Sequence, residues 1–550
     1  MPHCKDCNID FVITNEDRKF YEKLEVPEPK KCPDCRLIRR FNERNPKTLY
    51  YRQCDLSGNQ TLSQFNKNSK FPVYSPESWW GDDWDATEFE QEYDFKRPFF
   101  EQYEELKNKV PHLALFNTQG TIENSDYNNC TAYLKNCYLI AESDYCEDCY
   151  FSNLLKKCTD VVDCSVNYEN ELCYECIDCQ KSQRLFYAQD CENCNDSYFL
   201  NNCTSCKNCI GCINQRQKEY MIFNKQYSKE DYEKLKSEMS LNSNEGVEEL
   251  RKMSADFFLT QPHKYVIEEQ NQNSTGDHIY NCKNAHECFD SVDLEDCRYC
   301  QKLSLGVKDS MDYNSWGNKC ELIYQCCSVG DNCVNVKFCV NCQSNVSDCE
   351  YCAECFSISN CFGCVGLKRK KYCILNKQYS KEEYFEMKER IIEHMKKTGE
   401  YGEFFPSSLS LYPYNHSAAQ DFFPLTKEQA LAQGYKWQDK DPKEYQPATY
   451  QVPITIKEVP DSVVDEVLAC ENCGKNYRIQ SQELLLHRKI NAPLSKKCSD
   501  CRQLDMQSWK NPFRLWERKC DNCQAEIKTT YAPDRPEKVY CEKCYLNENN

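Results

Sequence analysis

The stretch that decides the fold runs from residue 146 to residue 212 and reads CEDCYFSNLLKKCTDVVDCSVNYENELCYECIDCQKSQRLFYAQDCENCNDSYFLNNCTSCKNCIGC. Within it, one column of residues recurs every 15 positions: Cys149, Cys164, Cys179, Cys194 and Cys209. Two further columns have the same spacing, namely Cys146, Val161, Cys176, Cys191 and Cys206, and Cys158, Cys173, Ala188 and Cys203. The regularity predicts an internal repeat whose coil has this length.

A repeat this short cannot contain a pair of helices, whereas one coil of a parallel β-solenoid with three short faces can use it. Val161 and Ala188 replace cysteine in the columns, and neither can bind a metal. Because free cysteine behaves as a small buried hydrophobe, we interpret the columns as core. Additional zinc or iron-sulfur sites remain alternatives, the latter suggested by Cys203, Cys206, Cys209 and Cys212. Columns three residues apart do not fit strand alternation, so some cysteines are expected at corners.

The middle of the chain is duplicated. Asn224-Lys-Gln-Tyr-Ser-Lys-Glu returns as Asn376-Lys-Gln-Tyr-Ser-Lys-Glu, after a C-x-x-C pair in each copy. Ser228 and Ser380 are each followed three residues later by an acidic residue, which predicts a capped helix that closes each half. The second half is looser, because the step between cysteines varies, as from Cys349 to Cys361 and from Cys339 to Cys352. We expect a similar but more irregular solenoid there.

The two ends of the chain are related by one constant offset without an insertion, which carries Cys4 onto Cys470 and Cys35 onto Cys501. Their C-x-x-C pairs have the spacing of four-thiolate zinc sites, in which two turns each present two thiolates to one ion. Such closed sites are structural, because they leave no position for water. The predicted metal ligands are Cys4, Cys7, Cys32 and Cys35 at the start, and Cys470, Cys473, Cys498, Cys501, Cys520, Cys523, Cys541 and Cys544 at the end.

The N-terminal copy has lost its second site. Ser57, Ser75 and Ser78 stand where the C-terminal copy has cysteines, which leaves Cys54 without partners. A serine hydroxyl is a poor zinc ligand. We therefore expect three zinc ions as structural cofactors.

Two resemblances accompany these motifs. The first cysteine pair, the later Asp17 to Tyr21 segment and Cys32-Pro-Asp-Cys-Arg36 resemble the probable zinc-ribbon family, which implies zinc binding over this N-terminal segment. The whole chain resembles an uncharacterised cysteine-rich family of bacteria with very small genomes, and this resemblance implies no particular activity. It is carried by Trp79-Trp80-Gly-Asp-Asp-Trp84, Phe-Gly-Cys-Val-Gly-Leu at 362–367 and Tyr401-Gly-Glu-Phe-Phe-Pro406.

The expected fold is mostly β with helical connectors: two tandem parallel β-solenoid-like halves flanked by duplicated zinc-ribbon-type modules. The predicted units are a ribbon module at 1–80, a helical connector at 81–120, the first solenoid half with its closing helix at 121–236, a connector at 237–271, the second half at 272–400, an extended and helical connector at 401–466, and a double ribbon module at 467–550. Thr426 to Gln429 opens one short helix, which Gly434 ends.

The composition limits the cellular compartments and the partners that are expected for this chain. The chain has 44 cysteines, mean hydropathy of -0.82 and no secretory or membrane-spanning pattern, so we expect a cytoplasmic protein whose C-x-x-C pairs bind metal rather than form disulfides. A net charge of -18 argues against a general nucleic-acid-binding surface.

The leading hypothesis is a non-enzymatic zinc-binding scaffold or adaptor whose terminal ribbons recognise a protein partner. One alternative is a nucleic-acid- or ribosome-associated protein, motivated by Arg36, Arg39, Arg40 and Arg44 on one predicted helical face. Another is a carbohydrate-active enzyme on the solenoid, with Asp160, Asp163 and Glu175 as candidate carboxylates. No catalytic residue, membrane contact or small-molecule substrate can be assigned.

Overall fold

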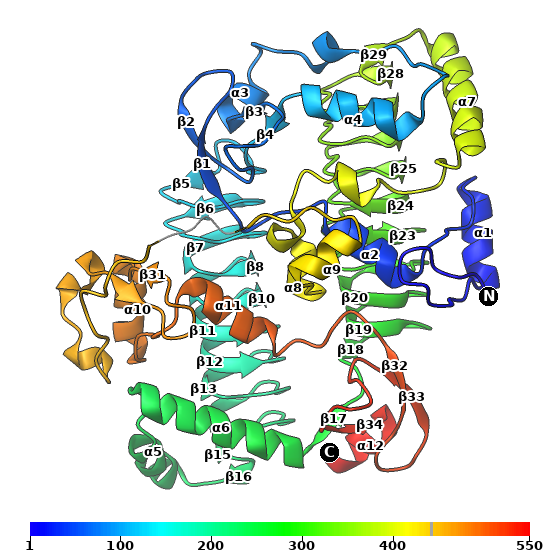
Figure 1. Ribbon diagram of the computed structural model, residues 1–550. Coiled ribbons are helices and arrows are strands. Elements are labelled where there is room, and N and C mark those ends of the chain that lie inside the picture. The colour runs from blue at the N-terminus through cyan, green and yellow to red at the C-terminus, as the bar shows by residue number, and fades with distance from the viewer. Residues whose placement is uncertain (440–443, 550) are drawn as a thin grey trace.

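The computed structural model describes residues 1–439 and 444–549, and it is mostly β with helices around the sheets. Two long stacks of short strands lie side by side and run in opposite directions (Figure 1). Stack 1 comprises β5 (Ile122–Glu123), β6 (Ala132–Lys135), β7 (Asp144–Tyr150), β8 (Asn153–Lys156), β9 (Thr159–Val162), β10 (Ser165–Tyr168), β11 (Glu171–Ile177), β12 (Gln183–Gln189), β13 (Asn195–Tyr198), β14 (Lys207–Ile210), β15 (Glu219–Ile222) and β16 (Lys225–Gln226).

Stack 2 has the same construction. It comprises β18 (Glu268–Glu269), β19 (Thr275–Tyr280), β20 (His286–Val292), β21 (Leu294–Glu295), β22 (Val307–Lys308), β23 (Met311–Asn314), β24 (Glu321–Cys327), β25 (Val334–Lys337), β26 (Ser347–Glu350), β27 (Ser359–Phe362), β28 (Lys371–Ile374) and β29 (Lys377–Gln378). Strands that pair between neighbouring layers run parallel, for example β8 with β10, β9 with β11 and β22 with β24, and only the last pair of each stack, β15 with β16 and β28 with β29, is antiparallel.

The layers of stack 1 are shorter than the coil predicted from the sequence. Cys149 pairs with Val161 and not with Cys164, so the predicted coil length is wrong. Every third residue of this stack has a positive φ, for example 53° at Asp178 and 54° at Asp190. The chain therefore changes direction every three residues, and four such sides make one layer. The step from Cys149 to Cys164 is one layer plus one side, so the cysteine columns of the sequence run diagonally across the stack.

The three-residue side also explains why cysteines recur at steps of three. The residue after each left-handed position points into the stack, where cysteines, Val161 and Ala188 form one core. The interpretation of the columns as core is thus confirmed. Side chains there also bind the backbone of the next layer: the N–H of Cys176 donates to Sγ of Cys164 (3.3 Å), and the N–H of Cys164 donates to Oγ of Ser152 (3.0 Å). Cysteine is small and can accept this bond.

Stack 2 has the irregular steps predicted for it. Val334 of β25 pairs with Ser347 of β26, whereas Ser347 pairs with Ser359 of β27, so the earlier layer is one residue longer than the later one. The extra residue enters at a corner, where two successive residues take positive φ, as at Ser344 and Asn345.

Capped helices close both stacks as predicted. Ser228 precedes α5 (Lys229–Glu238) and accepts the N–H of Asp231, and Ser380 forms a capping box with Glu383 at the start of α7 (Lys381–Thr398). The short helix predicted at Thr426 is α9 (Lys427–Ala432). The other elements of the connecting segments are η1 (Ala86–Phe89), α4 (Phe99–Lys109), β4 (His112–Leu113), α6 (Asn244–Thr260), β17 (Pro262–Lys264), η2 (Ser407–Leu409), η3 (Tyr414–His416), α8 (Ala418–Phe422), η4 (Ile456–Glu458) and η5 (Asp461–Asp465).

The terminal modules repeat each other at the offset that relates Cys4 to Cys470, except that the hairpin β30–β31 has only the bridge between His3 and Asp10 as its counterpart. The N-terminal one has α1 (Asn15–Lys23), α2 (Pro33–Phe41), β1 (Tyr50–Gln53), β2 (Gln60–Ser63), β3 (Val73–Tyr74) and α3 (Pro76–Trp80). The C-terminal one has β30 (Leu468–Ala469), β31 (Asn476–Tyr477), α10 (Ser481–Ile490), α11 (Ser499–Gln507), β32 (Trp516–Lys519), β33 (Glu526–Thr529), β34 (Lys538–Tyr540) and α12 (Glu542–Asn549).

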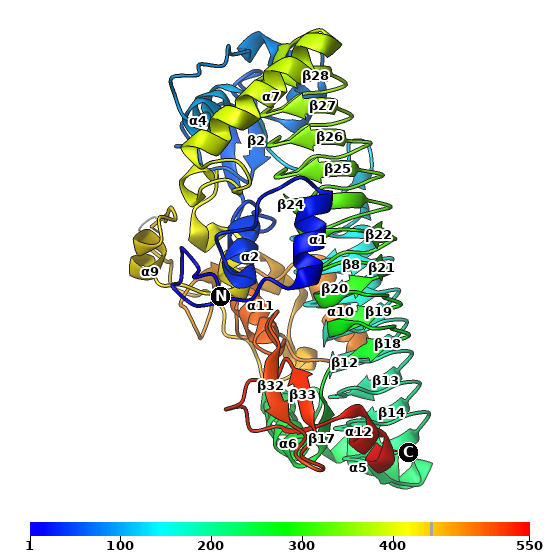
Figure 2. The same cartoon turned by 90° about the vertical axis from the view of Figure 1, so that its right-hand side faces the viewer.

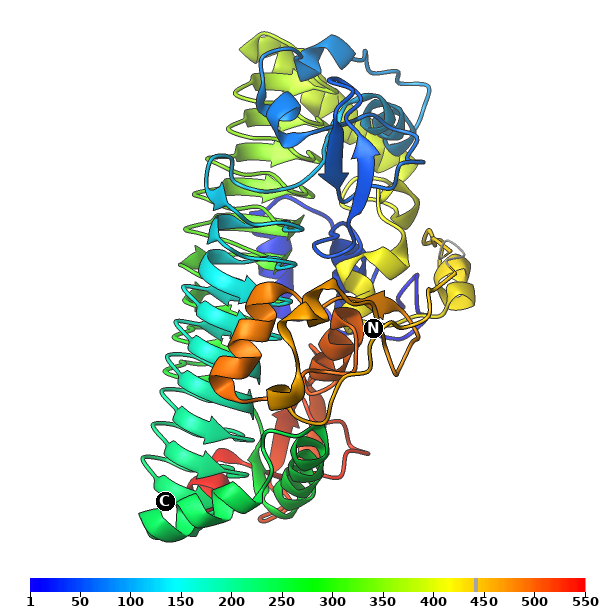
Figure 3. The same cartoon turned by 90° about the vertical axis from the view of Figure 1, so that its left-hand side faces the viewer.

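The modules are crossed with respect to the stacks. Helices α1 and α2 of the N-terminal module lie against stack 2 (Figure 2), whereas the orange C-terminal helices α10 and α11 lie against stack 1 (Figure 3). The first half of each module therefore braces the stack that is farther from it in the sequence. Within residues 1–439 and 444–549, no helix has the length and apolar character needed to cross a bilayer.

Candidate metal centres

The structure brings the predicted ligands together in three groups of four cysteines, counted over the described residues. They are Cys4, Cys7, Cys32 and Cys35; Cys470, Cys473, Cys498 and Cys501; and Cys520, Cys523, Cys541 and Cys544. In each group the four sulfurs lie within 4.8 Å of one another. All 44 cysteines lie in the described residues and carry free thiols. Four sulfurs at this separation can surround one tetrahedral ion.

Each centre combines a tight turn with the start of a helix. In the first, Cys4 and Cys7 come from a turn that Asn8 closes with a φ of 57°, and Cys32 is the N-cap of α2. Cys498 likewise precedes α11. A turn that supplies two ligands and a helix start that supplies the other two define a treble-clef arrangement, which refines the zinc-ribbon type expected from the sequence.

Backbone N–H groups donate hydrogen bonds to ligand sulfurs in these turns. The N–H of Cys32 donates to Sγ of Cys4, and that of Cys541 to Sγ of Cys520, both at 3.3 Å. Burial alone would raise the pKa of Cys470, but hydrogen bonds from the N–H groups of Cys498 and Cys473 outweigh it and lower the pKa to about 6. The thiolate is the form that binds metal.

The second half of the N-terminal module has the backbone arrangement of a metal centre, although Cys54 is the only one of the four ligand positions that still carries a sulfur. The N–H of Ser75 donates to Sγ of Cys54 (3.2 Å), as the N–H of Cys541 does to Cys520 in the other copy. The thiol of Cys54 donates to Oγ of Ser78 (3.5 Å), and Ser75 and Ser78 are bonded to each other (3.3 Å). Hydrogen bonds thus occupy the place that a metal would take.

Buried ion pairs fix the modules on the stacks. Nε of Arg36 lies 2.8 Å from Asp312 of stack 2, and Arg40 binds the other oxygen of the same carboxylate at 3.1 Å. In the C-terminal module, Arg502 lies 3.1 Å from Asp163 of stack 1 and 3.1 Å from Glu483. These side chains are almost fully buried. The helices that begin at the cysteine centres therefore carry the contacts that hold the stacks.

The residues that motivated the two alternative functions also form ion pairs within the chain. Arg39 pairs with Asp6, and Arg44 with Glu142 at 2.8 Å, so the predicted basic face forms ion pairs within the chain. Of the candidate carboxylates, Asp163 binds Arg502, while Asp160 pairs with Lys489 (2.8 Å) and Glu175 with Arg251 (2.7 Å). These pairs attach the C-terminal module and α6 to stack 1.

The proposed iron-sulfur ligands do not converge. Cys203, Cys206, Cys209 and Cys212 lie on successive sides of the layers, and each thiol donates to a backbone carbonyl at 3.3 to 3.5 Å. They are not among the groups of described residues that could share an ion. They belong to the core of stack 1.

Comparison with known proteins agrees with the geometry of the first centre. Residues 2–44 match the model of a family described as a probable treble clef domain. None of the curated proteins compared with the chain matches it. Among solved structures, a protein described as a "putative acetyltransferase from Desulfovibrio desulfuricans G20" has 8% identity and a TM-score of 0.10, over 48% of this chain and 77% of its own. A likeness of this size carries no argument.

One further group of possible ligands was missed from the sequence. It joins Asp178 and Asp190 of stack 1 to His278 of stack 2. The signal that could have found the first two is their spacing, which equals the register of the layers but not the predicted coil length. They directly follow Ile177 and Gln189, which pair with each other in neighbouring strands.

Proposed function

We propose that the protein is a zinc-stabilised scaffold or adaptor. In this proposal the three cysteine centres hold structural zinc, and the two stacks are β-solenoids that act as a rigid body between partner-binding ends. Zinc suits four thiolates at tetrahedral separation, and a site filled by four protein ligands has no position for substrate. A reducing compartment, such as the cytoplasm, would keep both the ligands and the core thiols free.

The observation that carries the proposal is the position of Cys32 and Cys498. Each is the N-cap of a helix whose next turn holds the buried arginine that grips a stack, Arg36 in α2 and Arg502 in α11. An ion bound by these cysteines would fix the helix starts, and through them the clamp on both stacks. The metal would then act on the architecture and not on a substrate.

A protein partner fits the exposed surface of the terminal modules better than a nucleic acid does. Ile9 and Val12, next to the first centre, are 61% and 59% exposed, and Leu504 on α11 is 61% exposed. Exposed apolar side chains are common at protein interfaces, whereas phosphate binding needs free cations. The arginines beside the first centre are engaged in ion pairs.

Metal removal and partner capture test the proposal together. We expect zinc in the purified protein, and we expect a strong chelator to increase hydrogen exchange in α2, in α11 and in the layers around Asp312 and Asp163. Capture from native lysate should retain a protein partner, and Ile9→Ser with Val12→Ser should weaken it. Val334→Ser, at a 41% exposed position on stack 2, is the matched control. A zinc-free native protein, or one without partners that turns over a substrate, would overturn the proposal.

A further inference from the structure

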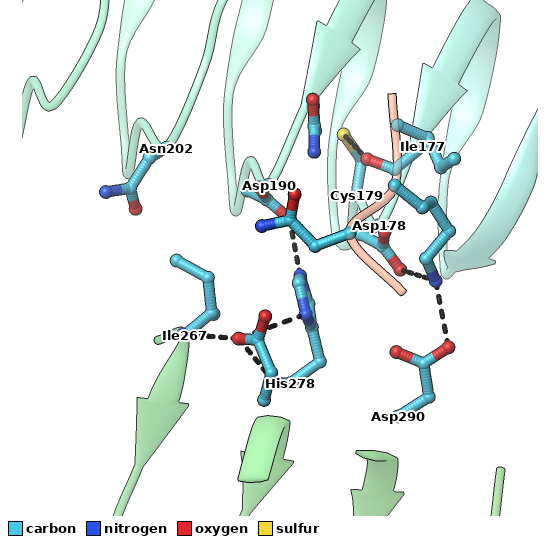
Figure 4. Close-up of polar contacts among 12 residues, drawn as sticks. Ile177, Asp178, Cys179, Asp190, Asn202, Ile267, His278 and Asp290 are labelled. Carbon is cyan, nitrogen blue, oxygen red and sulfur yellow. Dashed lines mark hydrogen bonds and ion pairs between the residues drawn. The ribbon is translucent and has the colours of Figure 1, made fainter. Parts of the chain in front are cut away.

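A cluster of ligand-type side chains lies between the two stacks, away from the cysteine centres (Figure 4). One ligand atom each of Asp178, Asp190 and His278 lies within 4.8 Å of the others. Asp178 and Asp190 occupy the same left-handed corner of successive layers of stack 1, and His278 takes the corresponding corner in stack 2, with a φ of 52°. The register of the layers and the antiparallel placement of the stacks therefore build the cluster.

The imidazole of His278 is held from its far side. Nε2 forms a hydrogen bond with Oδ1 of Asp190 at 2.7 Å, whereas Nδ1 faces Oδ1 of Asp277 at 3.4 Å. Asp277 is itself fixed, because its carboxylate accepts the N–H of Ile267 (2.7 Å) and the hydroxyl of Thr530. A carboxylate behind one ring nitrogen is the arrangement that orients metal-binding histidines and makes the other nitrogen a better ligand.

Asp178 supplies an independent indication that a ligand is needed. Its side chain is 5% exposed, and Oδ1 receives Nζ of Lys510 at 3.1 Å. The second oxygen, Oδ2, is buried and has no hydrogen-bond partner among the described residues. A buried carboxylate oxygen without a partner is costly, and in native proteins it commonly marks an ion or a water.

The charges around the cluster favour a cation that carries more than one positive charge. Asp178, Asp190 and Asp277 are joined by Asp290, which lies 2.9 Å from the same Lys510. These four carboxylates outnumber Lys510 and His278, which are the cationic groups paired with them. A protonated imidazole would leave two negative charges without compensation, whereas a divalent ion with a neutral imidazole would leave one.

We propose that Asp178, Asp190 and His278 bind one divalent cation that ties stack 1 to stack 2. Two carboxylates and one imidazole suit Zn²⁺ or Mn²⁺. Nε2 of His278 is the ligand atom, the cation replaces its hydrogen bond with Asp190, and Nδ1 keeps the ring proton on the side of Asp277. The site is separate from the cysteine centres and would set how the two stacks lie against each other.

Elemental analysis of the whole chain tests this site, because the metal content of each variant can be compared with that of the wild type. After saturation with Zn²⁺ and removal of loosely bound metal, Asp190→Asn and Asp178→Asn should each contain one ion per chain fewer than the wild type. Asp196→Asn, at a corner of stack 1 where the carboxylate pairs with Arg184 (2.7 Å) and lies outside the cluster, should match the wild type. Because the cysteine centres are unchanged in all four proteins, their occupancy cancels from the difference.

A spectroscopic measurement on the unmodified chain covers the case in which a variant fails to fold. Mn²⁺ added to protein that holds only the three equivalents of Zn²⁺ needed by the cysteine centres should bind at one site per chain, and pulsed electron paramagnetic resonance should detect coupling to an imidazole nitrogen. The cysteine centres contain no imidazole. Equal metal content in the wild type and the folded variants, or bound Mn²⁺ without nitrogen coupling, would show that His278 holds a proton only and would overturn the proposal.

Discussion

Arg502 lies 3.1 Å from Asp163 across the contact between the C-terminal module and stack 1. Its counterpart in the N-terminal module, Arg36, makes the equivalent contact with Asp312 of stack 2 at 2.8 Å. A second pair of counterparts, Arg44 and Lys510, reaches both stacks: Arg44 binds Glu142 and Ser328, and Lys510 binds Asp178 and Asp290. The chain thus has approximate two-fold symmetry, in which each end clamps the opposite half.

Removal of the Arg502 guanidinium should destabilise the clamp strongly. Arg502→Ala leaves Asp163 and Glu483 buried without their partner, and the loss of one member of a buried ion pair costs about 3–5 kcal/mol. We expect a large decrease in the denaturant concentration at which the C-terminal module unfolds. Hydrogen exchange in α11, measured over a series of denaturant concentrations, should show it. The double variant Arg502→Ala with Asp163→Asn should recover part of the loss.

Arg488→Ala is the control for this prediction. Arg488 pairs with Asp461, whose side chain is 88% exposed, and exposed pairs contribute at most about 1 kcal/mol. If the two alanine variants had similar stability, the ion pair with Asp163 would not be what holds the module.

The buried imidazole of His487 should make stability depend on pH. Burial, reinforced by the nearby Arg502, lowers the pKa of His487 to about 3 in the folded chain, whereas an unfolded histidine titrates near 6.5. Above pH ~6.5 this difference has no effect. As the pH falls from about 6.5 towards 3, the unfolded chain binds a proton that the folded chain does not, and stability falls by up to about 1.4 kcal/mol per pH unit.

His487→Gln isolates this contribution, because its side chain stays neutral throughout. Urea unfolding between pH 7 and pH 4 should show a shallower loss of stability for the variant than for the wild type. Identical slopes would mean that the imidazole is already solvated in the folded protein. The slope is the relevant quantity, since the substitution also changes packing.

The layer structure predicts how core cysteines tolerate substitution. Sγ of Cys164 accepts the N–H of Cys176 in the next layer, and Ser152 does the same for Cys164. Cys164→Ser should keep this bond, whereas Cys164→Ala leaves a buried N–H without a partner, at a cost of about 1–3 kcal/mol. Thermal unfolding should rank the serine variant above the alanine variant. The reverse order would indicate that Cys164 contributes only volume.

The sequence predicts local features of this chain well and spatial ones less well. The cysteine groups and the helix that starts at Ser380 follow from residues close in sequence or in identical register, and the structure has them. The layer length was missed, because left-handed φ values occur at residues such as Leu154 and Val166 that rarely adopt them. If a layer had the length predicted from the cysteine columns, Asp178 and Asp190 would not align.

The buried role of Arg36 was also beyond the reach of sequence patterns. Its spacing from Arg40 marks one face of a helix, but only the crossed packing of the modules turns that face towards Asp312. The same packing explains why Asp163 is an anchor for Arg502 and not a free carboxylate. Both arginines depend on contacts with segments that are far away in the sequence.

The degenerate centre should regain a metal when its cysteines are restored. In the structure, Ser75 N–H still donates to Sγ of Cys54 at 3.2 Å, and Ser78 Oγ lies 3.5 Å from that sulfur, so the backbone that would present four thiolates is retained. The triple variant Ser57→Cys, Ser75→Cys and Ser78→Cys should therefore bind one zinc ion more per chain than the wild type. When cobalt replaces zinc, the triple variant should show more thiolate charge-transfer absorption than the wild type, by the amount that one centre contributes. Adding Cys54→Ser to the triple variant should weaken or abolish this gain, since it removes the fourth sulfur. An unchanged metal content in the folded triple variant would show that the N-terminal turn has lost the geometry of a centre together with its ligands.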